Sequence, residues 1–177
     1  MRGVVGEPDG AVAAAAAAGD PWAFEEIVRR YQGPVWRFLC RHLGDPDLAQ
    51  DVAQETFVRV HRGLPGFDGR SKLTTWMFQI ARNAAVDAQR AAQRRARLVA
   101  VADPPRPVPD ASLGAELQAA LDTLPPKLRE ALLLVEVTGL TYREAAEVLD
   151  APEGTVKSRV FHARDRLVRW MEGGEAR

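Results

Sequence analysis

The sequence predicts an all-α protein made of two small helical domains joined by a proline-rich linker. Four prolines lie between Asp103 and Asp110, and such a run cannot continue a helix but favours an extended spacer. The segments on either side are rich in Ala, Leu, Arg, Glu and Gln and lack the alternation of β-strands. We expect a mobile or weakly helical N-terminal arm at 1–18, a first domain at 19–98, the linker at 99–112, a second domain at 113–172 and a tail at 173–177.

Turn signals divide the first domain into helices. Asp20 before Pro21 begins a helix as an N-cap followed by a first-turn proline. We expect Gly33-Pro34 to interrupt that helix, because a proline removes a backbone donor from a helix interior. The later boundaries are a turn at 44–46, a helix from about 47, a loop at 63–69 and a final helix at about 74–97.

The end of the second domain has the pattern of a helix-turn-helix. After helices at about 113–124 and 127–138, the run from Thr141 to Glu144 is a Ser/Thr-x-x-Glu capping box. It begins a short helix that ends at Leu149, and after a turn a longer helix runs from near Glu153 to Trp170. A short helix, a tight turn and a longer helix form a common DNA-binding unit.

The last helix has one narrow apolar stripe, formed by Val156, Val160, Ala163, Leu167 and Trp170. The opposite face carries short polar and amphipathic groups between cations, which suits the major groove of DNA: Ser158, Phe161 and His162, flanked by Lys157, Arg159, Arg164 and Arg166. The alternative is a solvated amphipathic helix with ion pairs at i,i+4, for which only Asp165–Arg169 fits cleanly. The preceding turn favours DNA binding.

The long helix of the first domain has a second candidate surface. Trp76, Gln79, Asn83, Arg90 and Arg94 share one face, and aromatic, amide and arginine side chains suit single-stranded DNA. An equally good interpretation has Trp76 half-buried against the loop at 64–67, with the arginines as a solubilising tail.

Asp47, Asp51 and Glu55 recur at i,i+4 and form an acidic face on the third helix. Carboxylates at this spacing could bind Mg²⁺ or serve in acid–base catalysis. No phosphate-binding loop, convergent histidine or nucleophile motif accompanies them. We therefore expect a protein-docking face, and no catalytic residue, metal site or cofactor.

The composition is that of a globular chain without a membrane span. The 177 residues carry 24 Lys and Arg against 24 Asp and Glu, so the formal net charge is zero and any basic surface must be local. No window approaches about 18 uncharged apolar residues, and the alanine run from Val12 to Ala18 lacks the leucines of a signal peptide. The single cysteine, Cys40, excludes an intrachain disulfide and is expected to be a small core residue.

Four segments together resemble the compact bacterial RNA polymerase sigma factors of the extracytoplasmic-function (ECF) class. They occur in the order and spacing of the family, as GDPWAFEEIVRRY at 19–31, DVAQETF at 51–57, TWMFQIARN at 75–83 and EGTVKSR at 153–159. The resemblance covers roughly residues 18–170. It implies a sigma region 2-like helical bundle and a sigma region 4-like helix-turn-helix domain, with the linker threaded through RNA polymerase.

The resemblance also implies site residues. Docking on the clamp helices of the largest polymerase subunit is assigned to Asp51, Gln54 and Glu55. A pocket for a base flipped from the minus-ten element, with the helix beside it, is assigned to Phe67, Ser71, Lys72, Trp76, Asn83, Asp87 and Arg90. Reading of the minus-thirty-five element is assigned to Lys157, Ser158, Arg159, Phe161, His162 and Arg164, with Thr141, Tyr142 and Arg143 at phosphates. Lys157 and His162 stand where many members carry arginine, so recognition at the base pairs they face is expected to differ.

The implied partners are core RNA polymerase, through its clamp helices and flap, promoter DNA and an anti-sigma factor. The free chain is expected to be a cytoplasmic monomer without membrane insertion, reaching the membrane only through an anti-sigma partner. A free-standing helix-turn-helix repressor would need a dimerisation helix, and no heptad run is present. A metal-dependent enzyme built on Asp51 and Glu55 would lack any signal for a substrate cleft.

Overall fold

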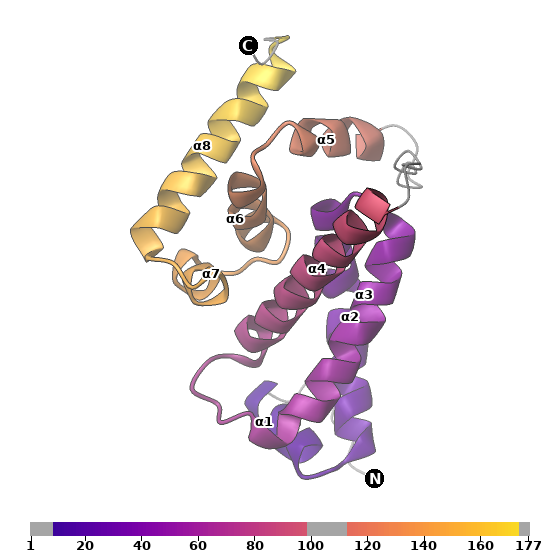
Figure 1. The fold of residues 1–177 in the computed structure, drawn as a ribbon. Coiled ribbons are helices and arrows are strands. Elements are labelled where there is room, and N and C mark those ends of the chain that lie inside the picture. The colour runs from indigo at the N-terminus through magenta and orange to yellow at the C-terminus, as the bar shows by residue number, and fades with distance from the viewer. Residues whose placement is uncertain (1–8, 99–112, 174–177) are drawn as a thin grey trace.

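The computed structural model describes residues 9–98 and 113–173, and the regular structure in these residues is entirely helical (Figure 1). This confirms the predicted all-α class. The first domain contains α1 (Asp9–Ala17), α2 (Pro21–Leu43), α3 (Pro46–Gly63), the short 3₁₀ turn η1 (Leu64–Gly66) and α4 (Leu73–Leu98). The second contains α5 (Leu113–Asp122), α6 (Pro126–Glu136), α7 (Tyr142–Leu149) and α8 (Glu153–Met171). The predicted linker at 99–112 lies outside the described residues.

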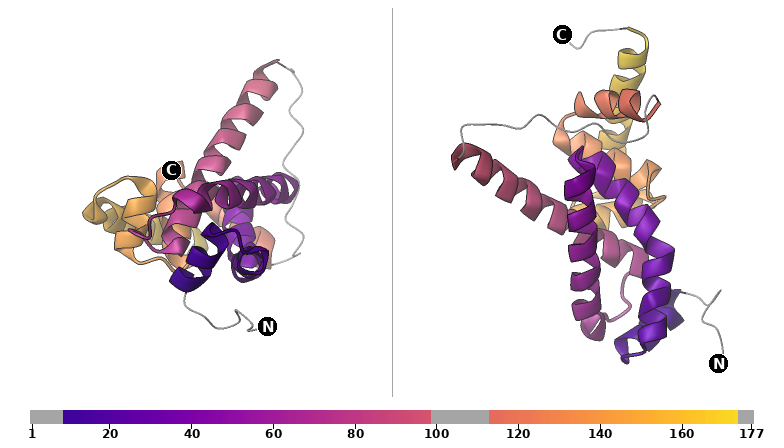
Figure 2. Two further views of the ribbon diagram at one scale, coloured as in Figure 1. Left: turned by 90° about the horizontal axis from the view of Figure 1, so that it is seen from below. Right: turned by 90° about the vertical axis from the view of Figure 1, so that its right-hand side faces the viewer.

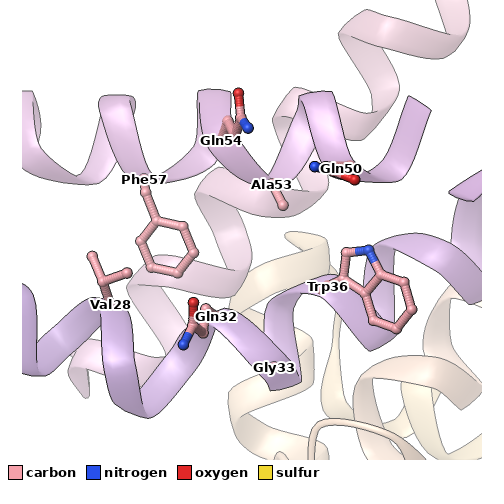
Figure 3. A pocket seen from close by; sticks show the side chains of 8 residues that line it. All are labelled: Val28, Gln32, Gly33, Trp36, Gln50, Ala53, Gln54 and Phe57. Atoms are coloured by element: carbon pink, nitrogen blue, oxygen red, sulfur yellow. The ribbon is translucent and has the colours of Figure 1, made fainter. Parts of the chain in front are cut away.

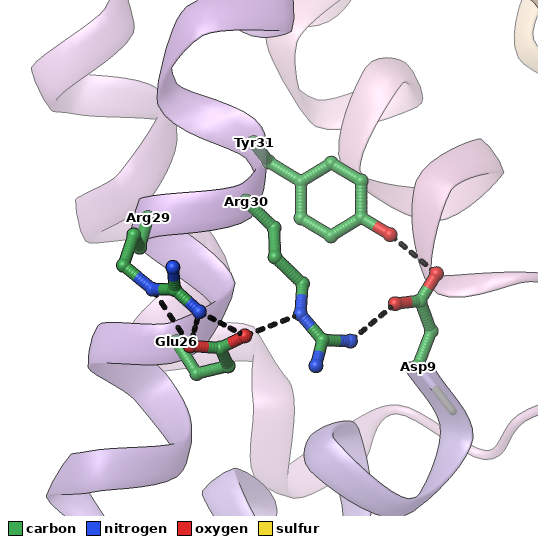
Figure 4. Close-up of polar contacts among 5 residues, drawn as sticks. All are labelled: Asp9, Glu26, Arg29, Arg30 and Tyr31. Atoms are coloured by element: carbon green, nitrogen blue, oxygen red, sulfur yellow. Dashed lines mark hydrogen bonds and ion pairs between the residues drawn. The ribbon is translucent and has the colours of Figure 1, made fainter. Parts of the chain in front are cut away.

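Residues 9–17 of the expected arm form α1, which packs against α2 and η1 with Val12 and Ala13 buried. Figure 4 shows how its first residue is tied to α2. The Asp9 carboxylate accepts hydrogen bonds from the Tyr31 hydroxyl and from Arg30 Nη1, the latter at 3.0 Å. Arg30 Nε also donates to Glu26 Oε1 at 2.6 Å. The core of the first domain therefore begins before Asp20.

The expected interruption at Gly33-Pro34 is wrong, because α2 continues through Pro34 to Leu43. A proline inside a helix costs about 3 kcal/mol. Tyr31, Val35 and Phe38 are buried on the same face before and after it, so packing against one core holds the two halves in line. The helix ends as predicted, with Gly44 in the left-handed region (φ 69°) and its N–H bonded to the carbonyl of Cys40.

The second domain packs around α6, whose residues 131–134 are buried. The predicted capping box is present at the start of α7. The Thr141 hydroxyl accepts a hydrogen bond from the Glu144 backbone N–H at 3.2 Å, and the Glu144 carboxylate accepts one from the Thr141 N–H at 2.8 Å. Together α7, the turn at 150–152 and α8 form the predicted helix-turn-helix.

The two domains pack against each other, with α7 on α4 and α6 on α2. Arg82 Nε of α4 lies 2.7 Å from Glu130 Oε1 of α6, and Lys72 Nζ lies 2.7 Å from Glu144 Oε1 of α7. We call this contact the domain interface, and define it by Arg41, His42, Lys72 and Arg82 of the first domain and Gly114, Gln118, Glu130 and Glu144 of the second. The last turns of α4 extend past the other helices (Figure 2).

Candidate nucleic-acid and polymerase interface

The outer face of α8 has the arrangement that the sequence predicts. Val156, Val160 and Ala163 are buried against the domain core. The predicted reading residues lie on the other side, where Lys157, Ser158, Phe161, His162 and Arg164 are exposed and Arg159 is half-buried. Phe161 leaves 66% of its surface in contact with solvent. An exposed aromatic ring between cations can pack on a thymine methyl group or a sugar while the cations contact phosphates.

The cations on this face have partners on the protein surface. Lys157 Nζ lies 2.7 Å from Glu153 and 5.9 Å from the centre of the Tyr142 ring. Arg164 pairs with Glu136 of α6. The predicted Asp165–Arg169 pair is confirmed at 2.6 Å, and Glu153–Lys157 is a second i,i+4 pair that the sequence analysis left out. Exposed pairs of this kind contribute at most about 1 kcal/mol, so a DNA phosphate can replace the carboxylate.

The three predicted phosphate contacts lie at the start of α7, beside this face. Arg143 is the most exposed of them, with 83% of its side chain in solvent and Glu147 Oε1 3.7 Å away. Thr141 is exposed although its hydroxyl is engaged in the capping box, and Tyr142 is half-buried beside Lys157. The N-terminus of α7 and the outer face of α8 form a surface to which two helices contribute.

The predicted minus-ten residues centre on a pair of aromatic rings. The rings of Phe67 and Trp76 lie 5.0 Å apart, and both side chains are half-buried. Trp76 also lies against Gly63, where an added Cβ would come within 3.0 Å of the indole ring. Trp76 is therefore half-buried against the loop, while Asn83 and Arg90 are exposed farther along α4.

Other members of the minus-ten set have partners elsewhere. Lys72, in the loop before α4, pairs with Glu144 across the domain interface. Asp87 lies 3.1 Å from Arg59 of α3, on the side of α4 that faces α3. Ser71 is half-buried in the same loop as Lys72. The structure thus brings Phe67 and Trp76 together, but it does not bring Lys72 and Asp87 to one site.

The predicted docking residues, Asp51, Gln54 and Glu55, are exposed on α3. Glu55 Oε1 lies 2.8 Å from Arg59 Nε, and because Arg59 also pairs with Asp87, one guanidinium links the docking face to α4.

A groove that the sequence analysis missed runs beside this face, between α2 and α3 (Figure 3). It has a volume of about 630 Å³ and is lined by Val28, Gln32, Gly33, Trp36, Gln50, Ala53, Gln54 and Phe57. Trp36, one of the lining residues, has 40% of its surface exposed to solvent. The signal for it in the sequence was the i, i+4, i+8 spacing of Val28, Gln32 and Trp36, a second face of α2 that turns away from the core.

Cys40 is buried, as expected for a small core residue, and burial raises the pKa of its thiol to about 11. Within residues 9–98 and 113–173, no group of three or more His, Cys, Asp or Glu side chains could hold a metal ion. No helix in that part of the chain is long and apolar enough to cross a membrane.

Comparison with known proteins gives a consistent result for both domains. The chain matches the family models of sigma-70 region 2 at residues 27–95 and of sigma-70 region 4 at residues 114–167. It is 38% identical over 165 residues to the ECF RNA polymerase sigma factor SigC of Mycobacterium tuberculosis, covering 89% of this chain and 88% of that protein. It is 33% identical over 166 residues to the ECF RNA polymerase sigma-E factor of Haemophilus influenzae, covering 84% and 87%.

Two solved structures have a similar fold. One is the sigma factor RpoE in complex with the anti-sigma factor NepR from Bartonella quintana, with a TM-score of 0.74 and 26% identity over 86% of this chain and 98% of that chain. The other is CnrH in complex with the cytosolic domain of CnrY, with a TM-score of 0.75 and 28% identity over 93% and 97%. Both similarities span the two domains.

Proposed function

Because this chain belongs to the ECF class of RNA polymerase sigma factors, we propose which of its surfaces contacts which part of the promoter and the polymerase. Members of this family direct transcription initiation and are not enzymes. The first domain, from Asp9 to residue 98, docks on core polymerase and recognises and melts the minus-ten element. The second domain, residues 113–172, binds the minus-thirty-five element. The linker at 99–112 connects the two domains.

The observation that carries this assignment is the outer face of α8. Ser158, Phe161 and His162 are exposed at its centre, with Lys157 and Arg164 at its edges. Each of the two cations pairs with an exposed carboxylate, and Lys157 also lies over the Tyr142 ring. We assign base contacts in the major groove to the central group and to Arg159. Phosphate contacts belong to Lys157, Arg164 and the start of α7, at Thr141, Tyr142 and Arg143.

Recognition of the minus-ten element belongs to the loop before α4 and to α4 itself. The Phe67 and Trp76 rings support each other, and a flipped base can stack on the exposed part of this pair. Extruding a base costs a few kcal/mol, and stacking on an aromatic ring returns about 1–3 kcal/mol. Asn83 is exposed and can read the edge of the base, while Ser71, Lys72 and Arg90 contact the strand. Asp87 orients Arg59 and flanks the site.

Docking on the clamp helices of the largest polymerase subunit uses Asp51, Gln54 and Glu55 together with the groove beside them. The carboxylates offer ion pairs at the rim, and the groove between Trp36 and Phe57 accepts an apolar side chain. The second domain docks on the flap through the exposed apolar residues Leu117, Val168 and Met171 of α5 and α8. An apolar centre with a charged rim is the usual anatomy of a protein interface.

An anti-sigma factor is the third proposed partner. The similar solved structures of RpoE and CnrH are complexes with NepR, an anti-sigma factor, and with the cytosolic domain of CnrY. We therefore infer that this chain is held inactive in the same general way, as a monomer in the bacterial cytoplasm, where its polymerase partner is found.

Run-off transcription with purified bacterial core polymerase on a randomised promoter library tests the proposal. Transcripts that require this protein, and that share a spaced pair of elements, are the expected result.

The variant Asp51→Ala/Glu55→Ala should lose co-elution with core polymerase on a sizing column, whereas Glu25→Ala, another exposed carboxylate, should retain it. Transcription that does not depend on the protein, or equal co-elution of both variants, would overturn the assignment.

A further inference from the structure

His42 lies at the C-terminal end of α2, buried in the domain interface with 7% of its surface exposed. Its ring stacks on Phe38 of the same helix, with 5.5 Å between ring centres. Neither of its ring nitrogens has a hydrogen-bond partner. A buried imidazole without partners is uncommon in proteins, because each unsatisfied polar group costs about 1–3 kcal/mol.

The charged groups around His42 act in opposite directions on its protonation. Glu130 and Arg129 face it from α6, and Arg82 faces it from α4. The Glu130 carboxylate already pairs with Arg82 at 2.7 Å, and Arg129 pairs with Asp122 of α5 at 3.0 Å. Burial is the main effect and lowers the pKa of His42, the two guanidiniums lower it further, and Glu130 opposes them.

Several buried polar atoms near His42 lack hydrogen-bond partners in the described part of the chain, which weakens the docking of the two domains. Among the described residues, five buried side-chain N or O atoms have no hydrogen-bond partner, and four of them belong to His42, Gln118 and Arg129. All three residues lie at or beside the domain interface. Separation of the domains would give each of these atoms access to water, so the interface resists opening less than a well-satisfied one of the same size.

We propose that His42 makes the docking of the two domains pH-dependent, with the domains docked while its ring is neutral and separating when it takes up a proton. The docked state binds the proton less tightly than the open state, so docking is strongest above the ordinary histidine value of about 6.5 and weakens below it. The docking equilibrium falls by about tenfold per pH unit until the lower pKa of the docked state is reached.

The ion pair between Lys72 and Glu144 does not share this response. The pKa of Glu144 is lowered to about 2, chiefly by its hydrogen bond with Lys72, so its carboxylate stays charged across the range in which histidine titrates. When the domains separate, that pair breaks as well, and Lys72 becomes available in the loop that we assign to the minus-ten element. Protonation of His42 would therefore change the availability of Lys72, although the two residues do not contact each other.

Distance measurement on the full chain tests the proposal. A donor and an acceptor dye on Glu25→Cys and Ser158→Cys, two exposed positions in different domains, report docking by energy transfer, while Cys40 remains buried and unlabelled. We expect transfer to fall reversibly as the pH is lowered from about 7.5 to about 5. His42→Phe keeps an aromatic ring on Phe38 but cannot take up a proton, so transfer should stay at its high-pH value.

The control is His61→Phe, which removes an exposed histidine of α3 and should respond to pH as the unmodified chain does. His42→Gln is a second uncharged variant in case the larger ring disturbs packing, and it should also lose the response. The proposal is overturned by a chain that does not respond, by an unchanged response in both His42 variants, or by loss of helical circular dichroism along with transfer. The readout needs neither polymerase nor DNA, so it is independent of the proposed function.

Discussion

Six of the nine residues assigned to the minus-thirty-five element lie on α8, and the other three lie at the start of α7. Those assigned to the minus-ten element are divided between a loop and four turns of α4. Most residues of the first set are exposed, and Lys157 and Arg164 have surface ion pairs that a phosphate can replace. The second has partners inside the protein, with Phe67 on Trp76, Lys72 on Glu144 and Asp87 on Arg59. A helix face can meet duplex DNA without rearrangement, whereas the loop must exchange internal contacts for contacts with a melted strand.

Trp76→Ala should produce the largest effect of any single change, because it removes the ring on which Phe67 rests. We expect a loss of about 2–3 kcal/mol in the free energy of unfolding, since the side chain is half-buried. Promoter opening, followed by the fluorescence of a base analogue in the minus-ten element, should fall by about 10–100-fold, the equivalent of one base stack. Trp22→Ala removes a tryptophan that is 65% exposed and should leave both quantities nearly unchanged. Normal opening by Trp76→Ala would contradict the assignment.

Phe161→Ala tests the proposed contact between α8 and the minus-thirty-five element. The ring is exposed, so thermal stability should not change, while binding to duplex minus-thirty-five DNA should weaken by about tenfold through the lost apolar contact. Met171→Ala alters another exposed apolar residue of α8, 69% of which is in solvent, and should bind duplex DNA normally. Equal losses in the two variants would mean that the outer face of α8 does not contact bases.

Asn83→Ala separates base recognition from polymerase docking on the same domain. Promoter opening should fall by about five- to tenfold, the worth of one hydrogen bond to a base, while co-elution with core polymerase is retained. Gln93→Ala removes an exposed amide near the end of α4 that belongs to neither proposed site and should open promoters normally. If Asn83→Ala loses opening and docking to the same extent, the residue does not line the base pocket.

Arg164→Ala should have the smallest effect, because this cation already pairs with Glu136. Affinity should fall by a similar factor on every promoter sequence, and the slope of log affinity against log salt should decrease by about one. Arg169→Ala removes another paired arginine of α8, with Asp165 at 2.6 Å, and should leave the slope unchanged. A change in base preference for Arg164→Ala would show a base contact instead.

Features that depend on neighbouring residues could be predicted from the sequence. The N-cap at Asp20, the glycine end of α2 at Gly44 and the capping box at Thr141 all involve hydrogen bonds within a few residues. The apolar stripe of α8 likewise follows from helical periodicity. These local rules placed the helix-turn-helix and the exposed face of α8 correctly.

Features that depend on distant packing could not be predicted in this way. The run of alanines in α1 has little apolar periodicity, and Val12 is buried because α1 packs against α2 and η1. The course of α2 through Pro34 depends on a core shared by both halves of the helix. The pairing of Arg82 with Glu130 joins residues 48 positions apart, and no local pattern in the sequence indicates it.

The position of α1 determines where a fragment containing only the first domain should begin. The family model for the first domain begins at residue 27, downstream of both α1 and the start of α2. A fragment cut at that boundary would lack Asp9, to which the Tyr31 hydroxyl donates, and would lack Val12, which covers part of the apolar core. Such a fragment would expose apolar core residues that α1 covers in the full chain. A clone intended to yield the isolated domain must therefore start upstream of Asp9.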